Sequence, residues 1–144
     1  MPVISSIKSI IKITHFSLLL FSFLLFHSVH ADTEQLEKNY RQSMDSSEHY
    51  LKKDPAKSLS SAITALEISR ILKDEEKLAK SYLQIGIIYR LSGNLSRSSF
   101  HLKKALTLGK NFKIYPIILK ESGITLKQQS RFDEALQKVP EALK

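Results

Sequence analysis

The stretch IGIIYRLSGNLSRSSFHLKKAL, residues 85–106, decides the fold. Apolar residues recur every three or four positions on both sides of a short polar break, which is the spacing of one face of an α-helix. Within the break, Gly93 supplies the backbone freedom that a tight turn needs, and Asn94 is a good N-cap for a following helix. The stretch therefore predicts two antiparallel helices joined by a short turn.

Gly86 stands inside the first of these two predicted helices. A glycine in a helix interior costs about 1 kcal/mol relative to alanine. It is useful only where another helix must approach closely, because it has no side chain to keep the two backbones apart. We therefore expect a neighbouring helix to pack directly against Gly86.

The same pattern recurs along the chain. Under a shift of 37 residues, eight positions keep their size class: Gly86 falls on Gly123, Tyr89 on Leu126, Gly93 on Ser130, Leu95 on Phe132, Ser98 on Ala135, Leu102 on Val139, Ala105 on Ala142 and Leu106 on Leu143. In the other direction, a shift of 40 places Leu106 on Leu66, and Asp54 followed by Pro55 predicts the start of a helix. The chain is thus predicted to contain three helix pairs, at about 34–73, 74–111 and 112–144.

Helix pairs that recur every 34 to 40 residues are typical of an α-solenoid. The chain resembles the tetratricopeptide repeat family in Tyr82-x-x-Ile85-Gly86-x-x-Tyr89, followed by Ser98-x-x-x-Leu102-x-x-Ala105. The motif RFDEAL at 131–136 is similar to the start of a second helix in that family, and the resemblance covers about residues 34–144. It implies an all-α solenoid of about three antiparallel helix pairs, which binds a peptide or protein partner in a concave groove.

In this family the first helix of each pair lines the concave side. The positions of this chain that would line the groove are Lys80, Leu83, Ile87, Arg90, Leu91, Ile117, Lys120, Ile124, Lys127 and Gln128. They mix aliphatic and basic side chains, which suits a partner with apolar anchors and acidic flanks. The alternative is that these side chains are buried by a neighbouring repeat or are only solvated.

Residues 1–31 differ in composition from the rest of the chain. Lys8 and Lys12 precede an apolar block, Val29-His30-Ala31 ends it, and no acidic residue occurs. This pattern predicts a secretory signal peptide that is cleaved after Ala31. The mature domain, residues 32–144, is then exported to a periplasm or secreted and keeps no stable membrane span. The alternative is an uncleaved signal anchor that tethers the chain to a membrane.

No sequence pattern indicates catalysis. The absence of cysteine excludes disulfides, zinc–thiolate sites and cysteine nucleophiles. After residue 31 the histidines are His49 and His101, whose spacing suits no metal site, and no phosphate-binding glycine pattern occurs. We therefore expect a protein that is not an enzyme and that uses no cofactor and no metal.

The charge of the chain bears on its partners. Residues 32–144 carry 20 basic and 14 acidic side chains, a net charge of +6. They contain no run of five or six like charges and no aromatic interleaving, so nucleic acid is not an expected partner. An acidic protein or peptide is the expected partner. Leu136 and Leu143 would leave the last predicted helix apolar and uncapped. This predicts that the helix pairs with a partner or, as a homo-oligomer, with another copy of the chain; the alternative is a shortened relative of a longer protein.

Together these patterns predict a non-catalytic, exported interaction module. Helical repeats behind a signal sequence also look like the extracytoplasmic sensing portions of bacterial membrane signalling proteins, of the histidine kinase or nucleotide cyclase type. The alternative is therefore a truncated or detached sensor domain of such a protein.

Overall fold

The computed structural model describes residues 32–142, and this part of the chain is helical, without strands. The predicted signal peptide, residues 1–31, lies outside the described residues. The chain divides into two compact units, Met1–Glu37 and Lys38–Lys144. Residues 32–37 of the first unit are helical. The prediction of an all-α fold is confirmed for the described residues.

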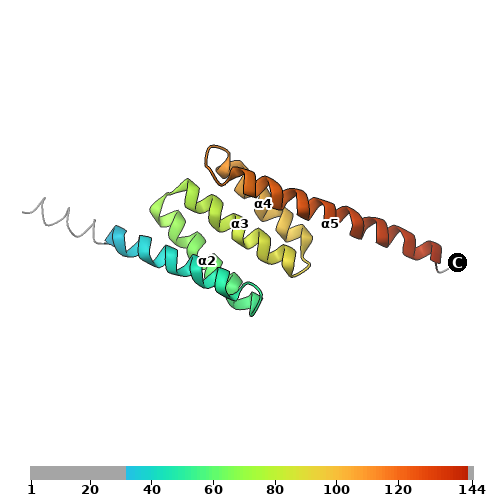
Figure 1. Ribbon diagram of the computed structural model, residues 1–144, viewed down its shortest axis with the longest axis horizontal. Helices are drawn as coiled ribbons and strands as arrows, with labels where there is room; N and C mark the ends of the chain where they lie inside the picture. Colours follow the sequence, from blue (N-terminus) through green and yellow to red (C-terminus); the bar gives the residue numbers. More distant parts are fainter. Residues whose placement is uncertain (1–31, 143–144) are drawn as a thin grey trace, which may run out of the picture. The chain divides into compact units, whose positions relative to one another are not determined.

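The second unit begins with helical residues 38–50, which are followed by α2 (Pro55–Leu72), α3 (Glu75–Leu91), α4 (Leu95–Gly109) and α5 (Tyr115–Ala142), as Figure 1 shows. The most extensive packing is between α3 and α4, while α2 lies against α3 and α5 lies against α4. A hydrogen bond of 3.3 Å between the hydroxyls of Ser47 and Ser58 joins helix 38–50 to α2. Helices that are consecutive in the chain are therefore also neighbours in space.

Three Asp or Asn side chains start the helices α2, α3 and α4. The side chains of Asp54, Asp74 and Asn94 accept hydrogen bonds of 3.0, 2.9 and 3.1 Å from the backbone N–H groups of Lys57, Lys77 and Arg97. Each bond satisfies a donor that the first turn of a helix leaves unpaired. Gly93 ends α3 with φ +76°, in the left-handed region that favours glycine. The helix boundaries predicted at Asp54-Pro55 and Gly93-Asn94 are confirmed.

The contact predicted at Gly86 is also confirmed. A Cβ atom placed on Gly86 would lie 2.7 Å from Leu102 Cγ, which is closer than two such carbon atoms can approach. Leu102 is fully buried, and around it the core cluster contains Ala62, Leu66, Ala79, Tyr82, Leu83, Ile85, Ile88, Ala105 and Ile118. The missing side chain of Gly86 is therefore what allows α3 and α4 to pack with Leu102 between them.

Small hydroxyl side chains bring the other helices together. Buried contacts of 3.2 Å join Ser69 to Ser81 between α2 and α3, and Ser98 to Thr125 between α4 and α5. Two further hydrogen bonds join helix 38–50 to α3 at a separation of 37 residues: Gln84 Nε2 donates to Ser47 Oγ, and Tyr40 Oη donates to the Lys77 carbonyl. These two bonds therefore hold the first helices of the first two predicted pairs together.

The third predicted helix pair is not formed. Helix α5 runs without a break through Ser130, the position equivalent to Gly93, and the Ser130 hydroxyl donates back to the Leu126 carbonyl at 3.1 Å. Arg131 stands where Asn94 caps α4, and an arginine side chain has no oxygen that could accept a bond from a helix N–H. Because the segment lacks both the glycine and the cap, the helix continues. The close contact expected at Gly123 is absent too, since no atom lies within 4 Å of a Cβ placed there.

Candidate functional site

Most of the groove residues predicted on α3 already have neighbours. Leu83 lies in the core and is 6% exposed, and Ile87 is half-buried against the core. The reason is that Gln84, beside Leu83, bonds to helix 38–50, so this side of α3 is covered. Lys80 Nζ lies 2.7 Å from Glu76 Oε1 in an ion pair along the helix. Leu91 is the apolar residue of this set that stays open, at 50% exposure.

The groove residues predicted on α5 are more accessible. The structure leaves Ile117, Lys120, Lys127 and Gln128 exposed and Ile124 half-buried. Their spacing of three and four residues places them along one side of the helix. This side therefore presents two aliphatic and two basic side chains together, and their role as a groove stays a prediction.

An ion pair connects the two sets of predicted residues. Arg90 Nη2 on α3 donates to Glu121 Oε2 on α5 at 2.6 Å, and the two side chains are 13% and 12% exposed. Arg90 is therefore bound within the molecule rather than free for a partner. Glu121 was not among the predicted site residues, because its partner lies 31 residues away and no local pattern connects the two.

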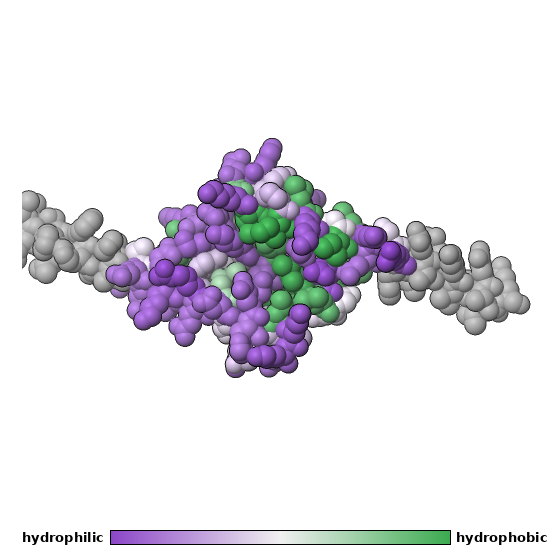
Figure 2. Space-filling view, viewed as in Figure 1, coloured by the Kyte–Doolittle hydropathy of each residue, from purple (hydrophilic) through white to green (hydrophobic). Residues whose placement is uncertain are grey.

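Part of the surface formed by α3 and α5 is apolar. Figure 2 shows hydrophobic surface over α3 and α5, bordered by hydrophilic side chains. Leu91 and Ile117 are each about half exposed. We call Leu91, Ile117, Lys120, Ile124 and Lys127 the α3–α5 face. This surface combines apolar residues with lysines, which is a composition that suits contact with a protein segment.

A second cluster, of aromatic and basic side chains, was missed by the sequence analysis. The His101 ring stacks on Tyr89 with centroids 5.4 Å apart and meets Phe100 edge-on at 5.2 Å. Lys104 Nζ lies 5.3 Å from the Tyr82 ring centroid and 4.7 Å from that of Phe100. The cluster joins α3 to α4, and the two tyrosines on α3 lie more than ten residues before the members on α4. Tyr82 and Tyr89 are seven residues apart and therefore lie on the same face of α3. These two aromatic residues were the signal that the sequence offered for the cluster.

The environment of His101 favours the neutral form of its side chain. Burial, then the positive charges of Lys104 and Arg97, lower the pKa of His101 from its ordinary value of 6.5. All three causes disfavour the imidazolium ion. His101 Nδ1 is buried and has no hydrogen-bond partner among the described residues. His101 therefore acts as an aromatic packing residue here, rather than as a charged site for an anion.

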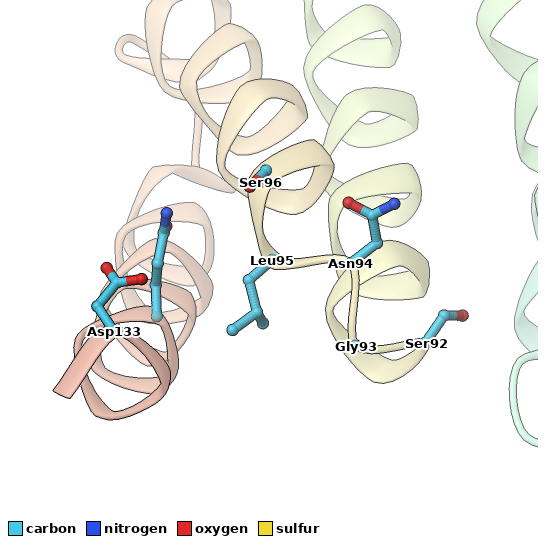
Figure 3. Close-up of a pocket in the computed structure, with 7 residues that line it drawn as sticks. Ser92, Gly93, Asn94, Leu95, Ser96 and Asp133 are labelled. Atoms are coloured by element: carbon cyan, nitrogen blue, oxygen red, sulfur yellow. The ribbon is translucent and has the colours of Figure 1, made fainter. Parts of the chain in front are cut away.

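A polar cavity of about 400 Å³ lies beside the turn between α3 and α4. Its lining comprises Ser92, Gly93, Asn94, Leu95, Ser96, Gln129 and Asp133. Figure 3 shows Asp133 on α5 across from the turn, with Leu95 between them. The Asn94 side chain is already used to cap α4. Within residues 32–142 no group of three or more His, Asp or Glu side chains could hold a metal ion. The cavity therefore offers one carboxylate and no metal site.

An apolar groove runs between α4 and α5. It has a volume of about 240 Å³ and is lined by Ser99, Leu102, Lys103, Leu106, Ser122 and Leu126. Leu126 is 59% exposed. We call this surface the α4–α5 groove. The sequence analysis did not assign it, because it expected a helix to cover it.

Comparisons of the chain with protein-family models, with curated proteins and with solved structures found no match. In the part of the chain that the structure describes, no helix combines the length and the apolar character needed to cross a membrane.

Proposed function

We propose that this chain is a non-catalytic, exported protein-interaction module built of tetratricopeptide-like helix pairs. Its α3–α5 face binds an acidic segment of a partner protein that also carries aliphatic side chains. The observation that carries the proposal is the exposure of Leu91 and Ile117, 50% and 49%, on two helices that an ion pair holds together. Apolar side chains gathered on one surface mark binding sites more often than scattered ones do.

The lysines of the face define the kind of partner. Lys120 and Lys127 are exposed on α5 on either side of the half-buried Ile124. Carboxylates on a partner would meet these charges while its aliphatic side chains cover Leu91 and Ile117. Surface charges of this kind raise the rate of association and select the partner, whereas the buried apolar contacts supply most of the affinity.

The ion pair between Arg90 and Glu121 supports binding by holding the face in place. It links α3 to α5 with two side chains that are mostly shielded from water. A surface that is already ordered loses less conformational entropy when a partner binds. For this reason Arg90 is a poor choice for a binding test, since its substitution would disturb the helices as well as the charge.

The test compares partner capture from the exported fraction by the full wild-type chain and by Lys120→Glu/Lys127→Glu. We expect the variant to recover its specific partner roughly tenfold less well, with unchanged helical content in circular dichroism. The matched control is Lys52→Glu/Lys53→Glu, which makes the same charge change on the turn before α2. Equal recovery by both variants and the wild type would overturn the proposal.

Export is a separate part of the proposal and rests on the sequence of residues 1–31. Amino-terminal sequencing of the chain recovered outside the cytoplasm should start at Asp32. A chain that retains Met1 and sediments with membranes would instead indicate the uncleaved anchor. The interaction function can stand with either result, because it depends on α3 and α5 alone.

A further inference from the structure

The side of α5 that borders the α4–α5 groove has no covering helix. Under the shift of 37 residues, Ile85 and Gly86 of α3 correspond to Ser122 and Gly123 of α5. On α3 this side is covered by α4, where Leu102 lies so close to Gly86 that no Cβ would fit. At Gly123 nothing lies within 4 Å of a Cβ atom built there. The position at Gly123 is therefore open to the close approach of another helix.

The open side of α5 exposes apolar surface. Leu119 and Leu126 are 48% and 59% exposed, and their separation of seven residues places them on one side of the helix, two turns apart. Leu102 and Leu106 line the α4–α5 groove from the α4 side. A helix laid along the groove would remove the leucines of α5 from water. The binding of an amphipathic helix in an apolar groove is a recurring mode of protein recognition.

The surroundings of the groove favour a helix over an extended segment. The backbone N–H and C=O groups of α4 and α5 are paired along their own helices. An extended chain in the groove would therefore leave its own backbone groups without protein partners, which costs free energy once they are shielded from water. A helix satisfies these groups internally.

A hydroxyl in the wall of the groove lacks a partner. Ser122 Oγ is buried and makes no hydrogen bond within the described residues. Neighbouring helices of this chain pair such hydroxyls, as Ser69 with Ser81 and Ser98 with Thr125, each at 3.2 Å. After a change of rotamer, the Ser122 hydroxyl could pair in the same way with a serine or threonine of a helix in the groove. An unpaired buried hydroxyl is costly, so this pairing would favour the bound state.

The surface that carries the groove is strongly basic. Residues 95–131 contain eight basic side chains and one acidic side chain, a net charge of +7, whereas residues 32–94 contain ten of each. The acidic side chain is Glu121, which is paired with Arg90. No ion pair among the described residues involves any of the eight basic side chains, and all are exposed: Arg97, Lys103, Lys104, Lys110, Lys113, Lys120, Lys127 and Arg131. The uncompensated positive charge of residues 32–131 is therefore concentrated on α4, the turn after it and α5.

This charge selects the occupant of the groove. A second copy of the chain would bring two such positive surfaces together, and residues 1–31 contain lysines and no acid, so neither is complementary. Lys103 lines the groove, and Lys110 follows seven residues later on the same side of α4. Carboxylates seven residues apart on a bound helix would have the same spacing along the groove. An anionic membrane also offers negative charge, but apolar residues that line a groove between two helices suit a helix better than a flat bilayer.

We propose that the α4–α5 groove binds an acidic amphipathic helix of another protein. The apolar side of this helix covers Leu119 and Leu126, a small hydroxyl side chain faces Ser122, and its carboxylates face Lys103 and Lys110. The groove is separate from the α3–α5 face, and its occupation does not require that face to bind a partner.

The test measures the binding of a fluorescent synthetic peptide to the full chain by anisotropy. The peptide has 15 residues, the length of α4, which covers the equivalent side of α3. It carries leucines at every third or fourth position, one serine among them, and glutamates beside them. The control peptide has the same composition, in an order that spreads the leucines around the helix. We expect the amphipathic peptide to bind roughly tenfold more tightly than the control peptide.

Two variants of the chain locate the binding site. Gly123→Leu fills the open position, and Lys103→Glu/Lys110→Glu reverses the charge beside the groove. Each should weaken binding of the amphipathic peptide roughly tenfold, with helical content retained in circular dichroism.

Matched controls separate the groove from the rest of the surface. Leu91→Ser alters the α3–α5 face, and Lys52→Glu/Lys53→Glu makes the same charge change on the turn before α2. Both should bind the peptide as the wild type does. If Leu91→Ser loses the peptide while Gly123→Leu keeps it, the peptide occupies the α3–α5 face. That result would overturn the groove proposal and leave the proposed function standing.

The remaining outcomes also decide the proposal. Loss of binding with both groove variants and not with the controls supports it. Equal affinity for the two peptides would show attraction by charge alone, and no binding of the amphipathic peptide would show that the groove does not accept such a helix; either result overturns the proposal. Vesicles of anionic phospholipid are tested in parallel. Binding to these vesicles without binding to the peptide would assign the basic surface to a membrane and overturn the proposal as well.

Discussion

At the scale of single residues, Gly86 and Gly123 stand at equivalent positions in opposite surroundings. Gly86→Leu would push a side chain into Leu102, and we expect it to lower the free energy of unfolding by about 1–3 kcal/mol, the usual cost of overpacking a core. Gly123→Leu meets open space and should raise that free energy by up to about 1 kcal/mol through helix propensity. Urea denaturation measures both. Equal effects at the two positions would contradict the assigned packing.

His101 gives the molecule a predictable response to pH. Burial, with Lys104 and Arg97 nearby, lowers the pKa of His101 in the folded chain below the value of about 6.5 that holds when the chain is unfolded. The unfolded chain therefore binds a proton more readily, and this contribution to stability is present above pH 6.5 and is lost as the pH falls through 6.5 toward the folded pKa.

We therefore expect the free energy of unfolding to fall between about pH 7.5 and pH 5.5. His101→Gln should flatten that slope, whereas His49→Gln, at an exposed histidine, should keep it. Urea denaturation at a series of pH values provides the measurement. A slope that survives His101→Gln would assign the response to other groups.

At the scale of elements, the ion pair between Arg90 and Glu121 is the charged contact that joins α3 to α5 in the described residues. Arg90→Met leaves the Glu121 carboxylate mostly buried without its partner, which should cost about 2–4 kcal/mol. Arg90→Met/Glu121→Met removes both charges and should cost less than Arg90→Met alone. Denaturant titration of the two single variants and the double variant completes the cycle. Strictly additive effects would mean that the pair contributes no coupling.

Some helix boundaries could be predicted from the sequence, and one could not. Asp54-Pro55 and Gly93-Asn94 are local signals, since a cap and a turn glycine act within a few residues of themselves. The boundaries that depend on them were therefore predicted correctly. The turn expected near Ser130 rested on repeat alignment alone, with no local signal of this kind, and there the structure has a continuous helix.

The candidate site was predictable only in part, for a related reason. The resemblance to a repeat family assigned Ile117, Lys120 and Lys127 to the groove, and the structure leaves these three side chains exposed. It also assigned Leu83 to the groove, although this residue lies in the core because helix 38–50 packs beside it. Burial by a neighbouring element is a long-range property, and the spacing of residues along one helix does not contain it.

At the scale of the whole molecule, the continuous α5 is the feature that separates this structure from the predicted set of three helix pairs. Ser130→Gly/Arg131→Asn copies the Gly93-Asn94 turn, which has φ +76° at the glycine and a side-chain cap on the next helix. We expect this variant to end α5 near Gln129 and to fold residues 132–142 back onto the α4–α5 groove. It should keep nearly the helical content of the wild type.

Urea denaturation checks this outcome. A segment folded back on the α4–α5 groove buries apolar surface that is exposed in the wild type, such as Leu126, so Ser130→Gly/Arg131→Asn should unfold at a higher urea concentration. Ser130→Ala/Arg131→Ala is the matched control, because alanine favours a continuous helix and leaves the groove open. If the turn variant is no more stable than this control, the turn chemistry at residues 130–131 does not determine whether the groove is filled.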